Sequence, residues 1–154
     1  MRQSVDVHNF LQNADIPHEI FLMEAPSKNA EQTAAILGLK PKEVVKSVIF
    51  FINGRPVNAV VPSNRKVSLK KLKTSLPDSN IELASSKNVV ETTGYVLGAT
   101  PPVAHKKSCQ TFIDEECMSL GVLYTGGGEL NAMLKIRPED LKRLTNARIM
   151  DISE

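Results

Sequence analysis

The sequence contains no tryptophan, and aromatic residues make up only 5% of the chain. Aliphatic side chains must therefore fill most of the hydrophobic core, and the 42% of hydrophobic residues supply enough of them. At 154 residues the chain fits a single domain, residues 1 to 154, and is short for two. Charged residues make up an ordinary 23%, so the composition predicts a folded protein.

Cysteine and histidine are also scarce. The two cysteines, Cys109 and Cys117, are too few for a disulfide scaffold or a cysteine-rich zinc site, and we expect both to be structural. The three histidines form no metal-binding pair. Three adjacent carboxylates in residues 114–116 would point in different directions, which predicts a solvated turn. The sequence therefore predicts neither a metal site nor a cofactor.

Long apolar runs are missing as well. No segment approaches the roughly 18 consecutive apolar residues that a membrane-spanning helix needs. The first 15 residues carry Asp6 and Asp15 and lack the apolar stretch of a secretory signal. We therefore expect a cytoplasmic protein with no membrane partner.

Acidic residues are missing from one long segment, between Glu43 and Asp78. The same segment holds Lys46, Arg55, Arg65, Lys66, Lys70, Lys71 and Lys73. Such segregation gives one region a positive potential that suits a polyanion such as RNA. A solvated surface face explains the same charges, so charge alone leaves both interpretations open.

Hydrophobic periodicity and turn residues predict an α+β fold with a mixed sheet. The strongest local signal is Asn53-Gly54 between two β-branched runs, which predicts an antiparallel hairpin. Ser4, Asn29, Ser68 and Pro138 are placed to begin helices. The expected helices are 4–14, 29–38, 68–76, 85–94 and 138–144, and the expected strands are 19–23, 44–52, 57–61, 110–113, 122–124, 130–136 and 147–152.

Lys46 lies in the middle of one of these apolar runs. Strand alternation places it on the same face as Val48 and Phe50, and the opposite face is mainly apolar too. This pattern is typical of a central strand that is covered on both sides. A lysine there either reaches water past its neighbours or lies in a cleft, where burial would lower its pKa from about 10.4. The alternation leaves both possibilities open.

Two glycine-containing segments could form walls of a binding site. Residues 94–107 read GYVLGATPPVAHKK, a stiff loop that leads into basic residues, although a plain connecting loop has the same composition. His105 in this loop could act as an acid, a base or an RNA contact. Gly126-Gly127-Gly128 could let backbone N–H groups converge on a carbonyl oxygen or an anion. It lacks the residues of a phosphate-binding P-loop.

Several motifs occur in a specific order over about residues 4 to 152. They are V-x-K-S before an N-G hairpin, T-G-Y-x-x-G-x-x-P-P-x-x-x-K-K, F-I-D, Y-x-G-G-G and P-E-D-L. In this order and spacing the chain resembles the YbaK family, which is related to the editing domain inserted in bacterial prolyl-tRNA synthetases. The resemblance implies a compact α+β fold with a curved, mixed, partly barrel-like sheet. It also implies hydrolysis of the ester that links a mischarged amino acid to the terminal adenosine of a tRNA.

The resemblance implies roles for individual residues. Lys46 would be catalytic and hold the adenosine end, while a ribose hydroxyl of the substrate helps to activate water. It also implies a substrate pocket of Gly98, Pro102, Gly126 and Gly127, to which we add Thr100 and His105 from the same loop. From the distribution of charge we predict an RNA-binding surface of Lys66, Lys70, Lys71, Lys73, Lys106 and Lys107. No serine or cysteine nucleophile pattern is evident, which favours catalysis by positioning and electrostatics.

The chain departs from the best-known bacterial deacylases of this family at two places. Ala104 stands where many have glycine, and residues 129–133 replace an Arg-Gly pair and an acidic residue. We expect both changes to touch the pocket, and so to bear on the amino acid removed. The family expectation is Cys or Ala on a proline tRNA, with aminoacyl-tRNA as a partner and prolyl-tRNA synthetase as a candidate partner.

A second hypothesis is a non-catalytic module of the same fold that binds tRNA or a synthetase. Lys46 favours the enzyme, because a pure binder need not keep a lysine on a buried strand face.

Overall fold

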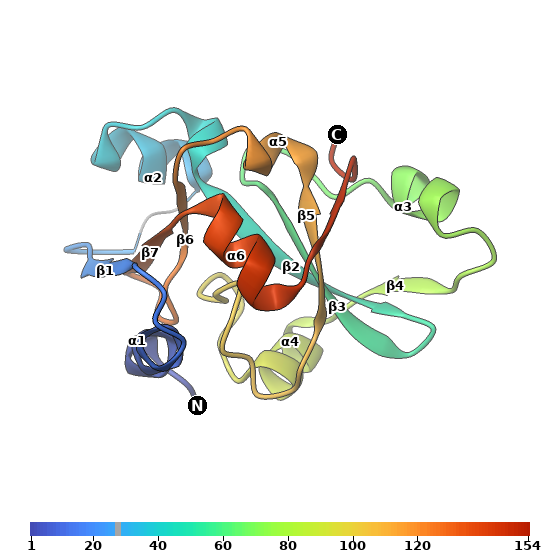
Figure 1. The fold of residues 1–154 in the computed structure, drawn as a ribbon, viewed down its shortest axis with the longest axis horizontal. Coiled ribbons are helices and arrows are strands. Elements are labelled where there is room, and N and C mark those ends of the chain that lie inside the picture. The colour runs from blue at the N-terminus through green and yellow to red at the C-terminus, as the bar shows by residue number, and fades with distance from the viewer. Residues whose placement is uncertain (27–28) are drawn as a thin grey trace.

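Two β-sheets with helices packed against them make up the fold (Figure 1). The computed structural model describes residues 1–26 and 29–154. The larger sheet has the order β4-β2-β3-β5-β8, formed by β4 (Ile81–Leu83), β2 (Val45–Ile52), β3 (Arg55–Pro62), β5 (Gln110–Asp114) and β8 (Arg148–Met150). Its β4-β2-β3 part is antiparallel, whereas β3, β5 and β8 run parallel. The prediction of an α+β fold with a mixed sheet is therefore confirmed.

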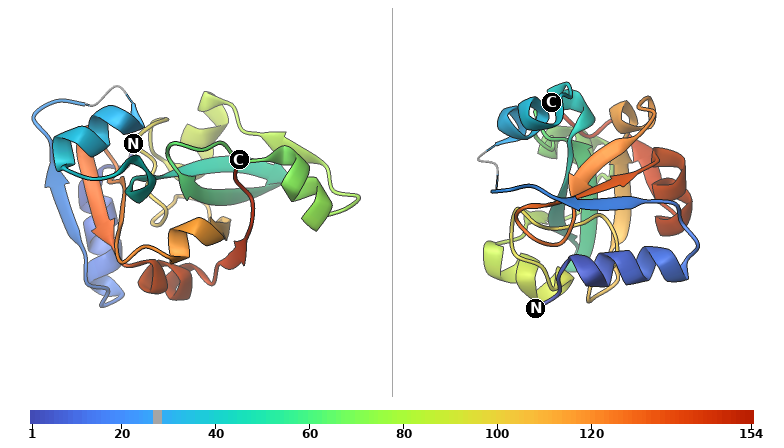
Figure 2. Two further views of the ribbon diagram at one scale, coloured as in Figure 1. Left: turned by 90° about the horizontal axis from the view of Figure 1, so that it is seen from above. Right: turned by 90° about the vertical axis from the view of Figure 1, so that its left-hand side faces the viewer.

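The smaller sheet is antiparallel, with the order β1-β7-β6. Its strands are β1 (Glu19–Leu22), β7 (Ala132–Ile136) and β6 (Leu123–Gly126). A single bridge between Val44 and Tyr124 brings β6 against the start of β2. This sheet lies at one end of the molecule, and α3 lies at the other (Figure 2). A barrel-like closure of the two sheets stays a prediction.

The helices are α1 (Ser4–Asn13), α2 (Ala30–Leu37), α3 (Leu69–Ser75), α4 (Ser86–Thr93), α5 (Glu115–Met118) and α6 (Pro138–Thr145), with a short 3-10 helix η1 (Pro41–Glu43). None of the helices in the described residues is long and apolar enough to cross a membrane.

The larger sheet has a hydrophobic core on each face. On one face, Val45, Val60 and Ile113 pack with residues of α1, α5 and α6. On the other face, Phe50 and Phe112 pack with Leu72 of α3. The strand alternation predicted for β2 is thus confirmed. A third cluster, of Met23, Ala34, Val44 and Met133, joins the smaller sheet to α2.

Local turn and cap signals were mostly correct. The Asn53-Gly54 turn joins β2 to β3, and both turn residues have positive φ, 51° and 80°. Asn29, Ser68 and Ser85 each accept a main-chain N–H at the start of their helix. The prediction for Ser4 was wrong, because Gln3 precedes the helix and pairs reciprocally with Asp6.

Two other predictions need correction, and one strand was missed. The expected strand 130–136 begins only at Ala132, and the short strand β4 gave no sequence signal. The expected turn at 114–116 is the junction of β5 and α5, where Glu115 and Glu116 are exposed as expected but Asp114 is not. Asp114 is fully buried and caps α5, and its carboxylate accepts the main-chain N–H of Ile152 at 2.9 Å and of Ser153 at 3.1 Å. Its charge is tolerated inside because main-chain donors from the C-terminal segment satisfy it.

Candidate active site

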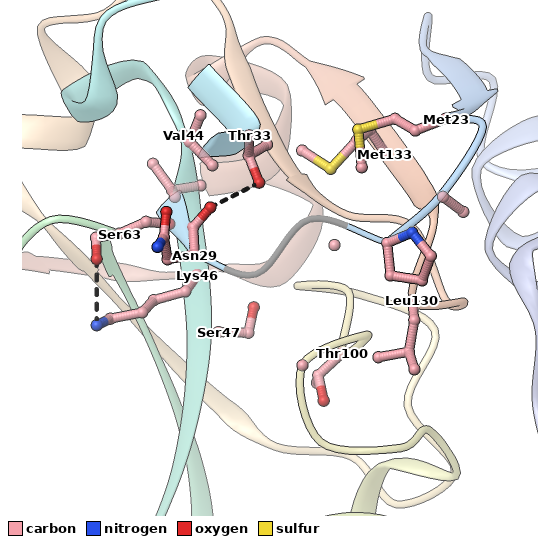
Figure 3. A pocket seen from close by; sticks show the side chains of 15 residues that line it. Met23, Asn29, Thr33, Val44, Lys46, Ser47, Ser63, Thr100, Leu130 and Met133 are labelled. Carbon is pink, nitrogen blue, oxygen red and sulfur yellow. Dashed lines mark hydrogen bonds between the residues drawn. The ribbon is translucent and has the colours of Figure 1, made fainter. Parts of the chain in front are cut away.

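A cavity of 320 Å³ lies where the two sheets meet (Figure 3). Its wall comes from the start of β2, the loop after α4, the β6-β7 turn and the segment around α2. The lining residues are Met23, Pro26, Asn29, Thr33, Val44, Val45, Lys46, Ser47, Ser63, Gly98, Thr100, Gly126, Leu130, Ala132 and Met133. We call this cavity the pocket.

An open sheet edge gives the pocket its position. Strand β4 pairs only with residues 50–52 of β2, and the bridge to β6 is at Val44. Between these two points no strand in the described residues is paired with β2 on that side. Lys46 and Ser47 therefore reach the pocket from opposite faces of the same strand, around its uncovered edge.

Lys46 extends along one side of the pocket, toward Ser63 (Figure 3). Its Nζ is 3.5 Å from the carbonyl oxygen of Ser63, a long contact, and no carboxylate in the described residues forms an ion pair with it. Burial lowers the pKa of Lys46, and the nearby charge of Lys66 lowers it further. Burial disfavours the charged form of this lysine, and no acidic partner in the described residues compensates for that. An anionic ligand would favour the charged form, so the lysine is suited to bind one.

Three of the predicted substrate residues line the pocket opposite Lys46, namely Gly98, Thr100 and Gly126. Thr100 is buried, and Gly98 is exposed in a conformation with φ 91°. Gly126 is fitted tightly against this loop, because a Cβ on it would lie 2.6 Å from the carbonyl oxygen of Thr100. Glycine is thus needed at 126 so that two walls of the pocket can touch.

Two of the three glycines in the turn do not offer their N–H groups in the way we expected. The N–H of Gly127 donates to the carbonyl of Ala132, and that of Gly128 donates to the carbonyl of Ala99, both at 2.9 Å. These two donors are used within the protein and cannot converge on a bound oxygen. Gly127 itself packs against the main chain of Ala132 and does not line the pocket.

Pro102 and His105 lie away from the pocket. They line a second cavity of 370 Å³, together with Ala104 and residues of α1 and α6. His105 Nε2 lies 2.6 Å from the carbonyl oxygen of Pro101, and burial lowers the pKa of the imidazole. The chain turns at Ala104, where φ is 63°, so residues before and after this point face different sides.

Of the two departures from the family pattern, only one therefore lies at the pocket. Ala104 does not touch the pocket, contrary to our expectation, and its left-handed φ explains why glycine suits the position. Leu130, Ala132 and Met133 do line the pocket, as expected. Any effect of these departures on the pocket thus comes from the β6-β7 turn.

The predicted RNA-binding lysines fall on separate parts of the surface. Lys70, Lys71 and Lys73 belong to α3, at the end of the molecule opposite the smaller sheet. Lys71 pairs with Asp151 at 2.8 Å. Lys66 is exposed and near enough to influence Lys46. Lys106 and Lys107 are exposed in the loop after α4, beside the second cavity.

Several pocket residues were not predicted. Ser47 follows Lys46 directly in the V-x-K-S motif. It would have been recognised as a pocket residue if the open edge of β2 had been known. Met23 and Thr33 gave no signal, because only tertiary packing brings β1 and α2 to the pocket.

Among residues 1–26 and 29–154, no group of three His, Cys, Asp or Glu side chains could hold a metal ion.

The pocket thus combines one unpaired lysine, hydroxyl side chains and a glycine-shaped wall on an α+β scaffold. Residues 24–144 match the aminoacyl-tRNA editing domain. The chain belongs to this family.

Named relatives agree with this assignment. The chain is 29% identical over 126 residues to EbsC of Enterococcus faecalis, which bears the name of a Cys-tRNA(Pro)/Cys-tRNA(Cys) deacylase; the match covers 81% of this chain and 77% of EbsC. It is 31% identical to the proline–tRNA ligase of Desulfotalea psychrophila over 80% of this chain, but spans only 22% of that enzyme. The solved structure of the protein APE2540 superposes with a TM-score of 0.90 at 31% identity, covering 97% of this chain and 99% of APE2540.

Proposed function

We propose that this protein is an aminoacyl-tRNA deacylase, which hydrolyses the ester between a mischarged amino acid and the terminal adenosine of a tRNA. The observation that carries the proposal is the placement of Lys46 in the pocket, opposite Gly98, Thr100 and Gly126. The editing-domain family and the name of EbsC support the same reaction.

The pocket suits hydrolysis without a covalent intermediate. Water attacks the ester carbonyl, the carbonyl oxygen becomes negative, and the bond to the ribose oxygen then breaks. Lys46 would hold the adenosine end by its charge, so that the ester lies between this lysine and the loop around Thr100. Fixing the ester in one orientation and stabilising its developing charge are sufficient sources of catalysis.

The size of the pocket bears on the amino acid. A volume of 320 Å³ is at the lower end for ligand pockets, which range from about 300 to 1,000 Å³. We therefore propose a small aminoacyl group such as Cys or Ala, carried by a proline tRNA. Apolar walls from Met23, Val44 and Met133 suit such a group. Discrimination between side chains that differ by one methylene would contribute only about 1–3 kcal/mol.

The tRNA would be held mainly through its phosphates. Lys66, Lys70, Lys73, Lys106 and Lys107 are exposed and free to contact the acceptor stem, whereas Lys71 must first leave Asp151. Such contacts release counterions, so binding should weaken as salt rises. The sequence similarity to proline–tRNA ligases makes prolyl-tRNA synthetase a candidate partner of the protein.

The test is single-turnover deacylation over a panel of mischarged tRNAs, with the wild type, Lys46→Ala, Lys46→Arg and Lys142→Ala. Lys142 is exposed on α6 and outside the pocket, so its variant controls for the loss of one positive charge. We expect Lys46→Ala to lose hydrolysis and to melt no earlier than the wild type. Lys46→Arg should not recover full activity, because its planar group has a different reach. A Lys46→Ala variant as fast as the wild type would refute the proposed role of this lysine.

A further inference from the structure

Ser47 turns its main-chain groups toward the uncovered edge of β2. On the β3 side, the carbonyl of Val44 accepts the N–H of Ser63 at 2.7 Å; on the β4 side, the carbonyl of Ile49 accepts the N–H of Ala84 at 3.0 Å. Main-chain groups of alternate residues face alternate sides of an antiparallel strand. Ser47 therefore faces the same side as Ile49, and no strand of the described residues pairs with it there. Its N–H is a donor at the edge of the pocket.

The side chain of Ser47 is held by Asn58 of β3. Asn58 is fully buried, and its Nδ2 lies 3.4 Å from Ser47 Oγ and 3.5 Å from the carbonyl oxygen of Pro102. A carbonyl can only accept, so the amide nitrogen must be the atom that faces Pro102. Ser47 Oγ then accepts from the same nitrogen, and its own proton is left for another acceptor. Figure 3 shows Ser47 extending from β2 to the side of the strand on which Thr100 lies, opposite to Lys46.

Hydrogen bonding alone does not explain why an asparagine occupies position 58. Its Oδ1 is buried and has no hydrogen-bond partner among the described residues, and both contacts of its Nδ2 are long. An apolar residue of the same shape would avoid this desolvation penalty. Buried polar groups that are poorly satisfied often serve a function. Contacts of this kind are often long before a ligand binds, and tighten around it.

We propose that Ser47 donates the hydrogen bonds that stabilise the carbonyl oxygen of the bound ester, and that Asn58 is a positioning residue that aims the Ser47 hydroxyl. The inference rests on the proposed deacylase function. One reason is that the N–H groups of Gly127 and Gly128, two of the three in the glycine turn, are already used within the protein. The hydroxyl and N–H of Ser47 remain, at the open edge next to Lys46.

The chemistry requires no proton from Ser47. As water adds to the carbonyl carbon, the C=O π electrons move onto the oxygen, which becomes an oxyanion. The Ser47 O–H and N–H donate hydrogen bonds to that oxygen and keep their protons. When the carbonyl re-forms, the C–O bond to the ribose breaks, and the departing ribose oxygen takes the proton that the attacking water has lost.

The experiment measures the single-turnover hydrolysis rate, tRNA affinity and thermal melting of Ser47→Ala, Ser47→Thr, Asn58→Leu and the double variant. Loss of one oxyanion donor typically costs about 10²–10³-fold in rate, so we expect Ser47→Ala to lose about 100-fold with unchanged tRNA affinity. Ser47→Thr keeps the hydroxyl and should stay within a few-fold of the wild type. Asn58→Leu should slow the wild type but have no further effect in the Ser47→Ala background, because it acts through that hydroxyl.

Thr125→Val is the matched control. The Thr125 hydroxyl is buried and without a partner in the described residues, but it does not line the pocket, so its loss should leave the rate unchanged. A Ser47→Ala protein with the wild-type rate would overturn the inference while the deacylase function stands. If the rate reductions of Ser47→Ala and Asn58→Leu multiply in the double variant, the proposed role of Asn58 is overturned. A wild type that hydrolyses no tRNA of the panel would remove both proposals together. If Asn58→Leu fails to fold, the comparison of Ser47→Ala with Ser47→Thr still decides the role of Ser47.

Discussion

Adding one methyl group at Gly126 should disturb the pocket without touching a ligand. A Cβ at this position would lie 2.6 Å from the carbonyl oxygen of Thr100 and 3.1 Å from that of Ala99. Both neighbours are main-chain atoms, so no side-chain rotation relieves the clash. Reaching an ordinary contact distance of about 3.4 Å requires the loop and the β6-β7 turn to separate by about 0.8 Å.

The expected size of the effect follows from that displacement. Overpacking of this kind typically costs about 1–3 kcal/mol. For a chain of about 150 residues, each kcal/mol lowers the melting temperature by about 2–4 °C, so Gly126→Ala should melt about 2–12 °C earlier. A shift of about 1 Å in a group that positions the substrate can cost about 100-fold in rate. We therefore expect deacylation to fall much more than tRNA binding.

Gly121→Ala is the control for this substitution. A Cβ at Gly121 would meet no atom within 4 Å, and its φ is not in the left-handed region. This variant should be as stable as the wild type, or more stable by about 0.4–1 kcal/mol, because alanine restricts the unfolded chain. Thermal melting and single-turnover hydrolysis are measured on both variants. If Gly126→Ala matches Gly121→Ala in both assays, the contact with Thr100 does not shape the pocket.

Three further predictions concern charge and titration. Asp114→Ala should lower the free energy of unfolding in urea by about 3 kcal/mol or more, because it leaves buried main-chain donors such as the N–H of Ile152 unpaired; a loss below 1 kcal/mol would contradict this. Since burial lowers the pKa of Lys46, the unfolded chain binds more protons between that pKa and about 10.4. Stability should therefore rise with pH across that window in the wild type, less so in Lys46→Met, and deacylation should fall as the cation is lost. Burial raises the pKa of Cys109 to about 11 and that of Cys117 to about 12, so iodoacetamide at pH 8 should label both slowly until urea unfolds the protein; rapid labelling of the folded protein would refute this.

The features that the sequence predicted well depend on neighbours along the chain. The Asn53-Gly54 hairpin, the caps at Asn29 and Ser68 and the alternation in β2 all involve residues a few positions apart. Lys46 was identified because a charged residue interrupted an otherwise apolar strand. Its location in a pocket could not be derived in the same way, because it depends on where β4 stops pairing with β2.

The errors involve partners that are distant in sequence. Asp114 looked like part of a solvated turn, yet its acceptors are satisfied by main-chain groups 38 and 39 positions later. Pro102 and His105 follow Gly98 and Thr100 closely, but the positive φ of Ala104 and the packing of the loop turn them toward another cavity. Sequence proximity within a loop therefore did not indicate a shared pocket.

The glycine turn shows most clearly why composition was insufficient to locate the donors of the site. Consecutive glycines are compatible with an anion-binding turn and with a tight main-chain contact, and the sequence is the same in both cases. The distances show that this turn makes a tight main-chain contact. Gly126 packs against the loop at Thr100, and the N–H groups of Gly127 and Gly128 donate to carbonyl groups within the protein. The donors that we propose lie on β2, at Ser47, where a partner strand is missing. A missing strand partner is a property of the topology, so the donor site of this pocket becomes recognisable only when the pairing of β2 with β3, β4 and β6 is known.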